Sequence, residues 1–315
     1  MTEPGSEGFL GVDGGATRTR FLLANAAGEV LARSEAGGSL LGVGEDEAIA
    51  VRIGEEARSL AGAAGLELPL AALCAGLAGA AGRPRARAEC AAKLEALGVA
   101  GRVTLASDAE VAFEDAFGEG DGILLIGGSG SIGLARSLAE TGDPALRRVG
   151  GWGALLGDEG SGYGIGLAGL RAAVAASEGR APETSLLAAL YEVLDRDSVR
   201  ALFEWTEAAD KPAIAALAPA VIEVAREGDQ VAARIVDETI QGLVAHARAL
   251  RGRYFFTSPP PSVALVGGLV QDGGPLRSQL RRALEAEAFE VVAAPVVPVR
   301  GAARMARRLA VGEVS

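Results

Sequence analysis

The chain has 315 residues, 49 % of them hydrophobic, which is enough for two domains that each have a core of their own. It carries 41 acidic and 30 basic residues, and the resulting net charge of −11 repels phosphate backbones, so a nucleic-acid partner is not expected. Its two cysteines, Cys74 and Cys90, form no CxxC pair, so neither a zinc site nor a disulfide framework is indicated.

The N-terminal residues 1–8 are polar and acidic, without the basic and apolar regions of a secretory signal. The stretch 60–82 is rich in Ala and Gly, but Glu67 and Pro69 interrupt it. This interruption favours a buried helix end followed by a strand over a membrane span. We therefore expect a cytoplasmic protein with no membrane partner.

The first third of the chain predicts three strands, a helix, a strand, a helix and a strand. These elements are expected at residues 9–12, 21–25, 30–33, 45–64, 70–75, 83–97 and 103–106. This order is typical of an actin-like domain with the ribonuclease-H fold.

A second pair of strands, at 122–126 and 132–135, begins the remainder of the chain. After a strand and loop at 147–157, helices are expected at 162–177, 182–193, 199–207, 211–227, 229–251, 276–286 and 301–309, and strands at 263–266 and 291–293. Both strand pairs are joined by glycine-rich hairpins, which suggests an internal duplication. We expect an α/β protein with one domain at 1–118 plus 298–315 and a second at 119–297.

The first hairpin reads Asp13-Gly14-Gly15-Ala16-Thr17. Its glycines let backbone N–H groups approach a phosphate, and Asp13 at the strand end is suited to hold Mg²⁺ through water. The alternative is an ordinary type I′ turn, for which Asp-Gly is a strong signal. The motif is neither a Walker A loop nor a Rossmann fingerprint.

The second hairpin contains Gly128-Ser129-Gly130-Ser131, whose hydroxyls and amides suit a γ-phosphate, although a flexible turn would have the same composition. Further along, Gly267-Gly268 would let an adenine or ribose pack against bare backbone. Two glycine-rich hairpins that each follow a buried strand predict one nucleotide held from two domains.

Asp108 follows the strand 103–106 and begins a helix. It is either the N-cap of that helix or a base that takes the proton from an attacking hydroxyl. Residues 150–163, GGWGALLGDEGSGY, form the most specific segment of the chain. Its Asp158 and Glu159 could accept hydrogen bonds from sugar hydroxyls, and the alternative is a plain loop with a helix cap at Ser161.

At this segment the chain resembles the BadF/BadG/BcrA/BcrD ATPase family, and within it the N-acetylglucosamine and glucosamine kinases, whose pattern GGWGxxxGDEGSGY is matched at every specified position. The resemblance continues at residues 11–19, 107–109, 128–131, 216–219, 228–229, 266–268 and 298–302. It implies a two-domain actin-like ATPase fold with an interdomain cleft, and ATP-dependent phosphorylation of an amino sugar or related hexose. Related kinases are often homodimers, so the resemblance also implies a homodimer.

The same resemblance assigns roles to single residues. It implies that Asp108 is the general base that activates the sugar hydroxyl. The residues implied to place Mg·ATP are Asp13, which is also the metal ligand, with Gly14, Gly15, Thr17, Gly128, Ser129, Gly130, Gly267 and Gly268. The residues implied to contact the sugar are Ser39, Gly151, Trp152, Gly153 and Asp158.

One departure from the family pattern concerns the sugar. The family often carries Asn where this chain has Leu40, and a leucine cannot make the hydrogen bond of that Asn, so the exact sugar stays open. Two alternative functions remain. The superfamily includes ATP-driven activators of CoA-ester reductases and dehydratases, which hold an iron–sulfur cluster through cysteines. The other alternative is a non-catalytic, sugar-sensing regulator.

Overall fold

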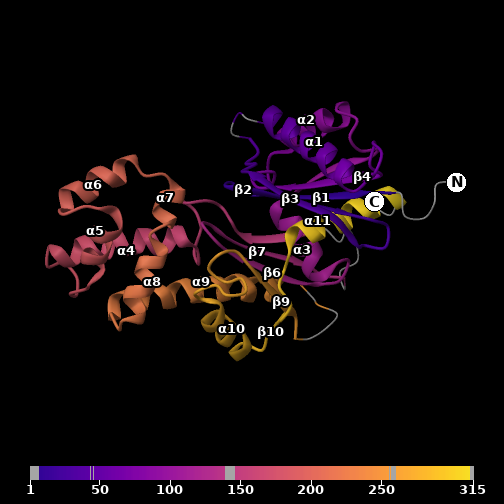
Figure 1. The fold of residues 1–315 in the computed structure, drawn as a ribbon. Helices are drawn as coiled ribbons and strands as arrows, with labels where there is room; N and C mark the ends of the chain where they lie inside the picture. The colour runs from indigo at the N-terminus through magenta and orange to yellow at the C-terminus, as the bar shows by residue number, and fades with distance from the viewer. Residues whose placement is uncertain are drawn as a thin grey trace. The chain divides into compact units, whose positions relative to one another are not determined.

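The computed structural model describes residues 7–42, 44, 46–138, 146–254, 256 and 260–312. The chain separates into two compact units (Figure 1). The first unit comprises Met1–Glu119 with Val296–Ser315, and the second comprises Gly120–Pro295. Each unit contains one five-stranded sheet and its own helices. Within the described residues, no helix is both long and apolar enough to cross a membrane.

The sheet of the first unit has the strand order β3-β2-β1-β4-β5. Its strands are β1 (Phe9–Gly14), β2 (Arg18–Ala24), β3 (Val30–Gly37), β4 (Ala72–Leu77) and β5 (Val103–Ser107). The first three strands are antiparallel neighbours, whereas β1, β4 and β5 run parallel. Every residue of β4, ALCAGL, is buried, as expected for a parallel strand that is covered on both faces.

The helices described in the first unit are α1 (Asp46–Ala63), α2 (Pro84–Ala96), α3 (Asp108–Phe117) and α11 (Pro298–Val311). Figure 1 shows α11, in yellow, beside α3, and α11 also packs on β1 and β4. Two glycines permit this close packing. A Cβ at Gly11 would lie 2.3 Å from the Ala303 nitrogen, and a Cβ at Gly301 would lie 2.0 Å from the Val111 oxygen. The end of the chain therefore completes the core of the first unit.

The sheet of the second unit has the order β10-β9-β6-β7-β8. Its strands are β6 (Gly122–Gly127), β7 (Ser131–Arg136), β8 (Arg147–Gly150), β9 (Ser262–Val266) and β10 (Glu290–Val291). Taken from β8, the order and the strand directions repeat those of the first unit: three antiparallel neighbours, then two parallel strands. This repeated topology confirms the predicted internal duplication.

The helices of the second unit are α4 (Gly162–Ser177), α5 (Leu186–Leu194), α6 (Val199–Ala208), α7 (Lys211–Ala215), α8 (Ala218–Arg226), α9 (Gln230–Arg253) and α10 (Arg277–Ala286). Helices α4, α8 and α9 share one apolar core with β6 and β9, which includes Ile165, Val221, Leu243, Leu125 and Leu265. This core fixes the start of α4 and the ends of β6 and β9, where several of the predicted motifs lie.

Some predicted boundaries are wrong. The single helix expected at 211–227 is two helices, because Pro219 has no N–H to donate and falls in the first turn of a new helix. The helix expected at 182–193 begins only at Leu186, and the strand expected at 291–293 is the two-residue β10. The last helix begins at Pro298 rather than at 301, since proline is favourable in a first helical turn.

Candidate functional site

Asp13 lies near the end of β1, the central strand of the first sheet. Its side chain is only 13 % exposed, and the nearest cation is Arg20, whose Nη1 is 3.7 Å from Asp13 Oδ2. Burial raises the pKa of Asp13 to about 6, Arg20 opposes that shift, and the nearby charge of Asp108 adds to it. Asp13 is therefore a buried carboxylate whose charge is only weakly compensated.

Asp108 is the first residue of α3, and the N-cap of that helix is Ser107. The Ser107 hydroxyl accepts a hydrogen bond from the Glu110 amide at 3.1 Å, and the Glu110 carboxylate accepts one from the Ser107 amide. This reciprocal pair is a capping box. The alternative in which Asp108 is the N-cap is therefore wrong.

The side chain of Asp108 is largely withdrawn from water. Burial raises the pKa of Asp108 above its ordinary value, and the hydrogen bond from the Ala109 amide to Oδ1, at 3.0 Å, opposes that shift. A carboxylate with a raised pKa and little competition for its oxygens is suited to accept a proton.

Asp13 and Asp108 lie at the same edge of the sheet. Strands β1, β4 and β5 are parallel neighbours, with Gly14 paired to Leu77 and Leu77 paired to Ser107. Two strand spacings therefore separate the two carboxylates, roughly 10 Å. Ligands of parallel α/β sheets commonly bind beyond the carboxyl ends of the strands, and this edge is such a place.

The first glycine-rich hairpin joins β1 to β2. The Gly15 amide donates to the Arg18 carbonyl at 2.8 Å, and no residue from Gly14 to Arg18 has a positive φ. The type I′ alternative requires two positive φ angles, so it is wrong. Thr17 is exposed at the tip of the hairpin.

The segment after β3 supports this hairpin. The Ser39 amide donates to the Gly15 carbonyl at 2.8 Å, and a Cβ at Gly38 would lie 2.0 Å from the Ala16 oxygen. The Ser39 side chain is fully buried, and its hydroxyl is 2.7 Å from the Thr19 hydroxyl. This placement favours support of the hairpin by Ser39 over the predicted sugar contact.

In the second unit the structure brings three predicted motifs together. The Gly128 carbonyl accepts a hydrogen bond from the Gly162 amide at 2.7 Å, and the Ser131 hydroxyl donates to the Glu159 carbonyl at 2.5 Å. Gly267, with φ 99°, packs so closely that a Cβ there would lie 2.5 Å from the Gly127 oxygen. The second hairpin, the segment before α4 and the turn after β9 therefore form one site.

The segment 151–157 follows β8, and its Trp152, Leu155 and Leu156 side chains are exposed. Gly150, Gly151 and Gly153 all have positive φ, which glycine adopts without steric cost. Trp152 is 64 % exposed, and the Arg148 guanidinium carbon lies 4.0 Å from the centre of its ring. The Trp152 side chain is therefore exposed with a cation over one face of its ring, and its contact with a sugar stays a prediction.

Asp158 departs from the exposed position that a sugar contact suggests. Its side chain is 3 % exposed, and its backbone has a positive φ of 66°. Oδ1 accepts a hydrogen bond from the Ser131 amide at 3.1 Å, and Oδ2 lies 2.5 Å from Lys211 Nζ at the start of α7. Sequence reasoning gave Lys211 no role, because nothing in the local sequence connects it with Asp158.

The two cysteines are buried within the first unit. Burial raises the pKa of the Cys74 thiol to about 12 and that of the Cys90 thiol to about 11, so both remain protonated. A cluster ligand must be an accessible thiolate, and this placement disfavours the activator alternative. Within the described part of the chain, no group of three or more His, Cys, Asp or Glu side chains is arranged to hold a metal ion.

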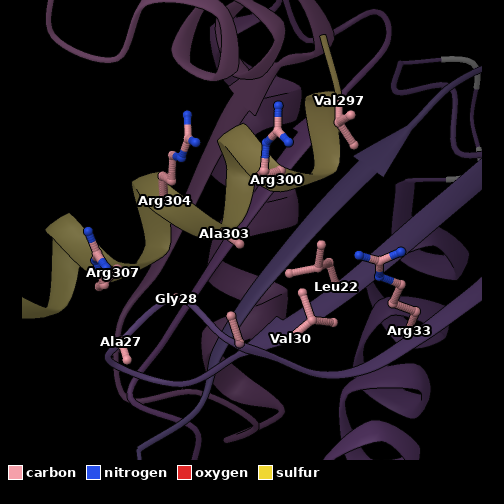
Figure 2. A pocket seen from close by; sticks show the side chains of 11 residues that line it. Leu22, Ala27, Gly28, Val30, Arg33, Val297, Arg300, Ala303, Arg304 and Arg307 are labelled. Carbon is pink, nitrogen blue, oxygen red and sulfur yellow. The ribbon is translucent and has the colours of Figure 1, made fainter. Parts of the chain in front are cut away.

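Two hollows in the structure lie away from these residues. One, of about 400 Å³ in the first unit, lies between the antiparallel strands and α11, and Figure 2 shows its Arg300 and Arg304 reaching away from Leu22 and Val30. The other, of about 1000 Å³ in the second unit, is largely apolar and includes Phe203. Neither contains a predicted site residue.

Known proteins match this chain over most of its length. The sequence profile of the BadF/BadG/BcrA/BcrD ATPase family matches residues 10–306. The N-acetylmuramic acid/N-acetylglucosamine kinase of Clostridium acetobutylicum is 28 % identical over 278 residues, which cover 87 % of this chain and 89 % of that protein. The N-acetyl-D-glucosamine kinase of Dictyostelium discoideum is 31 % identical over 252 residues, with coverages of 75 % and 76 %.

A solved structure is similar as well. The Chromobacterium violaceum protein provisionally assigned as an N-acetylglucosamine kinase has a TM-score of 0.76 with this chain at 29 % identity. The match covers 95 % of this chain and 98 % of that one. This similarity confirms the predicted two-domain actin-like ATPase fold.

Proposed function

Because this chain belongs to the BadF/BadG/BcrA/BcrD ATPase family, we propose that it is a kinase that transfers the γ-phosphoryl group of ATP to a hydroxyl of an amino sugar or related hexose. The observation that carries the proposal is the position of Asp108 at the start of α3, together with its raised pKa. Ser107 rather than Asp108 caps α3, and the partly buried Asp108 carboxylate, whose pKa burial raises and whose charge raises the pKa of Asp13, is available to accept a proton. The similarity to N-acetylglucosamine kinases supports an amino sugar as substrate.

In the proposed reaction the sugar hydroxyl oxygen attacks the γ-phosphorus of ATP. A sugar O–P bond forms, the bond between the γ-phosphorus and its bridging oxygen breaks, and ADP leaves with that oxygen. Asp108 takes the proton of the hydroxyl. Such transfers depend mainly on positioning and on stabilisation of charge, so one base and well-placed backbone amides are sufficient protein chemistry.

We assign the phosphate contacts unit by unit. In the first unit they come from the hairpin that contains Gly14, Gly15 and Thr17. The Ser39 amide holds this hairpin through its hydrogen bond to the Gly15 carbonyl. In the second unit they come from Gly128 and Ser129, and a Cβ at Gly128 would meet nothing within 4 Å, so a phosphate oxygen can approach that backbone. The turn at Gly267 and Gly268 is assigned to the nucleoside.

The residues of the first unit also fit Mg²⁺. Magnesium is usually bound by one or two carboxylates together with phosphate oxygens and water. Asp13 is a buried carboxylate whose closest cation, Arg20, is 3.7 Å away, beyond hydrogen-bond distance, so it can accept an ion or its water shell. Magnesium would be held by Asp13 and would neutralise charge on the phosphates.

For the sugar we propose contacts from Trp152, whose side chain is exposed, from the partly exposed Gly151 and Gly153 beside it, and from Asp158. A carboxylate has about four acceptor positions, so Asp158 can still accept from a sugar hydroxyl while it holds Ser131 and Lys211. Leu40 is partly buried and lies close to Gly79, where it offers no hydrogen bond to a substrate.

The test is release of ADP from Mg·ATP across a panel of hexoses and amino sugars. We expect release that depends on glucosamine, N-acetylglucosamine or N-acetylmuramic acid, and loss of that release in Asp108→Asn. The exposed carboxylate variant Asp197→Asn serves as the control. ADP release that no sugar stimulates would contradict the proposal, and sugar binding without ADP release would favour the regulator. Light scattering measures the molar mass in solution and so tests the homodimer that the family resemblance implies.

A further inference from the structure

Lys211 lies beside the second glycine-rich hairpin although it is far from it in the sequence. Its Nζ is 2.5 Å from Asp158 Oδ2, and the Asp158 side chain is 3 % exposed while that of Lys211 is 36 % exposed. A carboxylate buried to this degree is costly unless a cation compensates its charge. Lys211 supplies that cation.

The ion pair is in direct contact with the hairpin. The second oxygen of Asp158, Oδ1, accepts a hydrogen bond from the Ser131 amide at 3.1 Å. A Cβ at Gly130 would lie 2.8 Å from that oxygen and 3.0 Å from Lys211 Nζ. The ion pair thus occupies the space that a side chain at Gly130 would need. The corresponding space beside Gly128 is open.

Both partners of the pair are held by the surrounding structure. Asp158 has a positive φ, a conformation that is uncommon among non-glycine residues although aspartate tolerates it. Helix α7 begins with Lys211 and is capped by Asp210, whose carboxylate accepts from the Ala213 amide at 2.9 Å. It packs tightly on α4, since a Cβ at Gly166 would lie 2.1 Å from the Ile214 oxygen.

We propose that Lys211 is a positioning residue for phosphoryl transfer. By pairing with Asp158 it fixes the Ser131 amide and the backbone of the hairpin, so that the open side at Gly128 is presented to the phosphates of ATP. This inference rests on the proposed function for its role in catalysis, but the fixing of the hairpin is independent of any substrate.

The chain has only two lysines, which provides a matched control. Lys211→Met keeps the length of the side chain and removes the charge, while Lys93→Met removes a surface ion pair with Glu47 in the first unit. We expect Lys211→Met to raise the KM for ATP about tenfold and to lower kcat, because a misplaced binding loop costs both affinity and rate. Asp158→Asn should raise the KM for ATP in the same way, and Lys93→Met should leave both constants unchanged.

A KM for ATP that changes less than about twofold in Lys211→Met would overturn the proposal. A merely destabilised protein would lose active molecules and hence kcat, with no change in the KM for ATP. The KM therefore separates positioning of the hairpin from a general structural role.

Hydrogen exchange of the unliganded protein tests the hairpin without any reaction. We expect peptides that cover residues 127–133 to exchange faster in Lys211→Met than in the wild type, with unchanged exchange in α9. Unchanged exchange at 127–133 would overturn the proposal whatever the kinetics. If the wild-type protein phosphorylates no sugar, the proposed function fails, and the exchange experiment still decides whether Lys211 fixes the hairpin.

Discussion

Asp115 and Arg300 form a bidentate ion pair that joins α3 to α11, parts of the chain that are far apart in sequence. Arg300 donates from Nε to Oδ1 at 2.5 Å and from Nη2 to Oδ2 at 2.8 Å. The Val297 amide also donates to Asp115 Oδ2 at 2.7 Å, just before α11 begins. The Asp115 side chain is fully buried. One carboxylate therefore links α3 to the start of α11, where the chain returns to the first unit.

Asp115→Ala should destabilise the first unit by about 1.5–3 kcal/mol, because Arg300, which water can reach, and the Val297 amide both lose a charged hydrogen-bond acceptor. Urea unfolding followed by circular dichroism measures the loss. Arg200→Ala, which removes an exposed pair with Glu204, is the control and should cost less than about 1 kcal/mol. Equal unfolding midpoints for Asp115→Ala and the wild type would show that the pair contributes nothing.

Gly301→Ala should also destabilise the first unit, by at least about 1–3 kcal/mol. A Cβ at Gly301 would lie 2.0 Å from the Val111 backbone oxygen, so α3 and α11 would have to separate. Gly62→Ala is the matched helical control, since nothing lies within 4 Å of a Cβ there. That control should be neutral or stabilising by up to about 1 kcal/mol. Thermal unfolding of the two variants should therefore shift in opposite directions or by clearly different amounts.

The parts of the site that depend on local sequence could be predicted. The hairpins and the segment before α4 were located because glycines, hydroxyls and carboxylates followed buried strands, and the role of Asp108 as a base stays a prediction. The capping box could have been found too, since Ser107 and Glu110 have the required spacing. Recognition of this capping box in the sequence would have excluded Asp108 as the N-cap of α3.

The parts that depend on contacts between distant segments could not be predicted. Lys211 reaches Asp158 only because α7 packs on α4, and no spacing in the sequence encodes that approach. Likewise, Gly130 was predicted only as a nucleotide contact, and its sequence neighbours do not reveal that the ion pair fills the space beside it. The burial of Ser39 follows from its position beneath the first hairpin, which its sequence neighbours do not reveal.

His246 should make the second unit less stable in mild acid. Burial lowers the pKa of His246 below 6.5, with Glu159 opposing that shift, and among the described residues its Nδ1 has no hydrogen-bond partner. The unfolded chain therefore binds a proton more readily than the folded one, so stability is complete above about pH 6.5 and declines below it. Urea midpoints measured from pH 7.5 to pH 5 should fall more steeply for the wild type than for His246→Phe. Parallel curves would contradict this origin of the acid sensitivity.

The pH dependence of turnover should report the ionisation of Asp108. Because the proposed base works only when it is ionised, and burial raises the pKa of Asp108, kcat should rise with pH through a value above the 3.9 of a free aspartate. Asp108→Asn should lower kcat by about 10²–10⁴-fold and remove the part of this dependence that belongs to Asp108, leaving the part that follows Asp13, whose pKa is about 6. The measurement is the initial rate of ADP release at saturating ATP and sugar between pH 4.5 and 8, at about half-unit steps. A wild-type kcat that is constant down to the lowest pH would mean that the Asp108 carboxyl is not the group that accepts the proton.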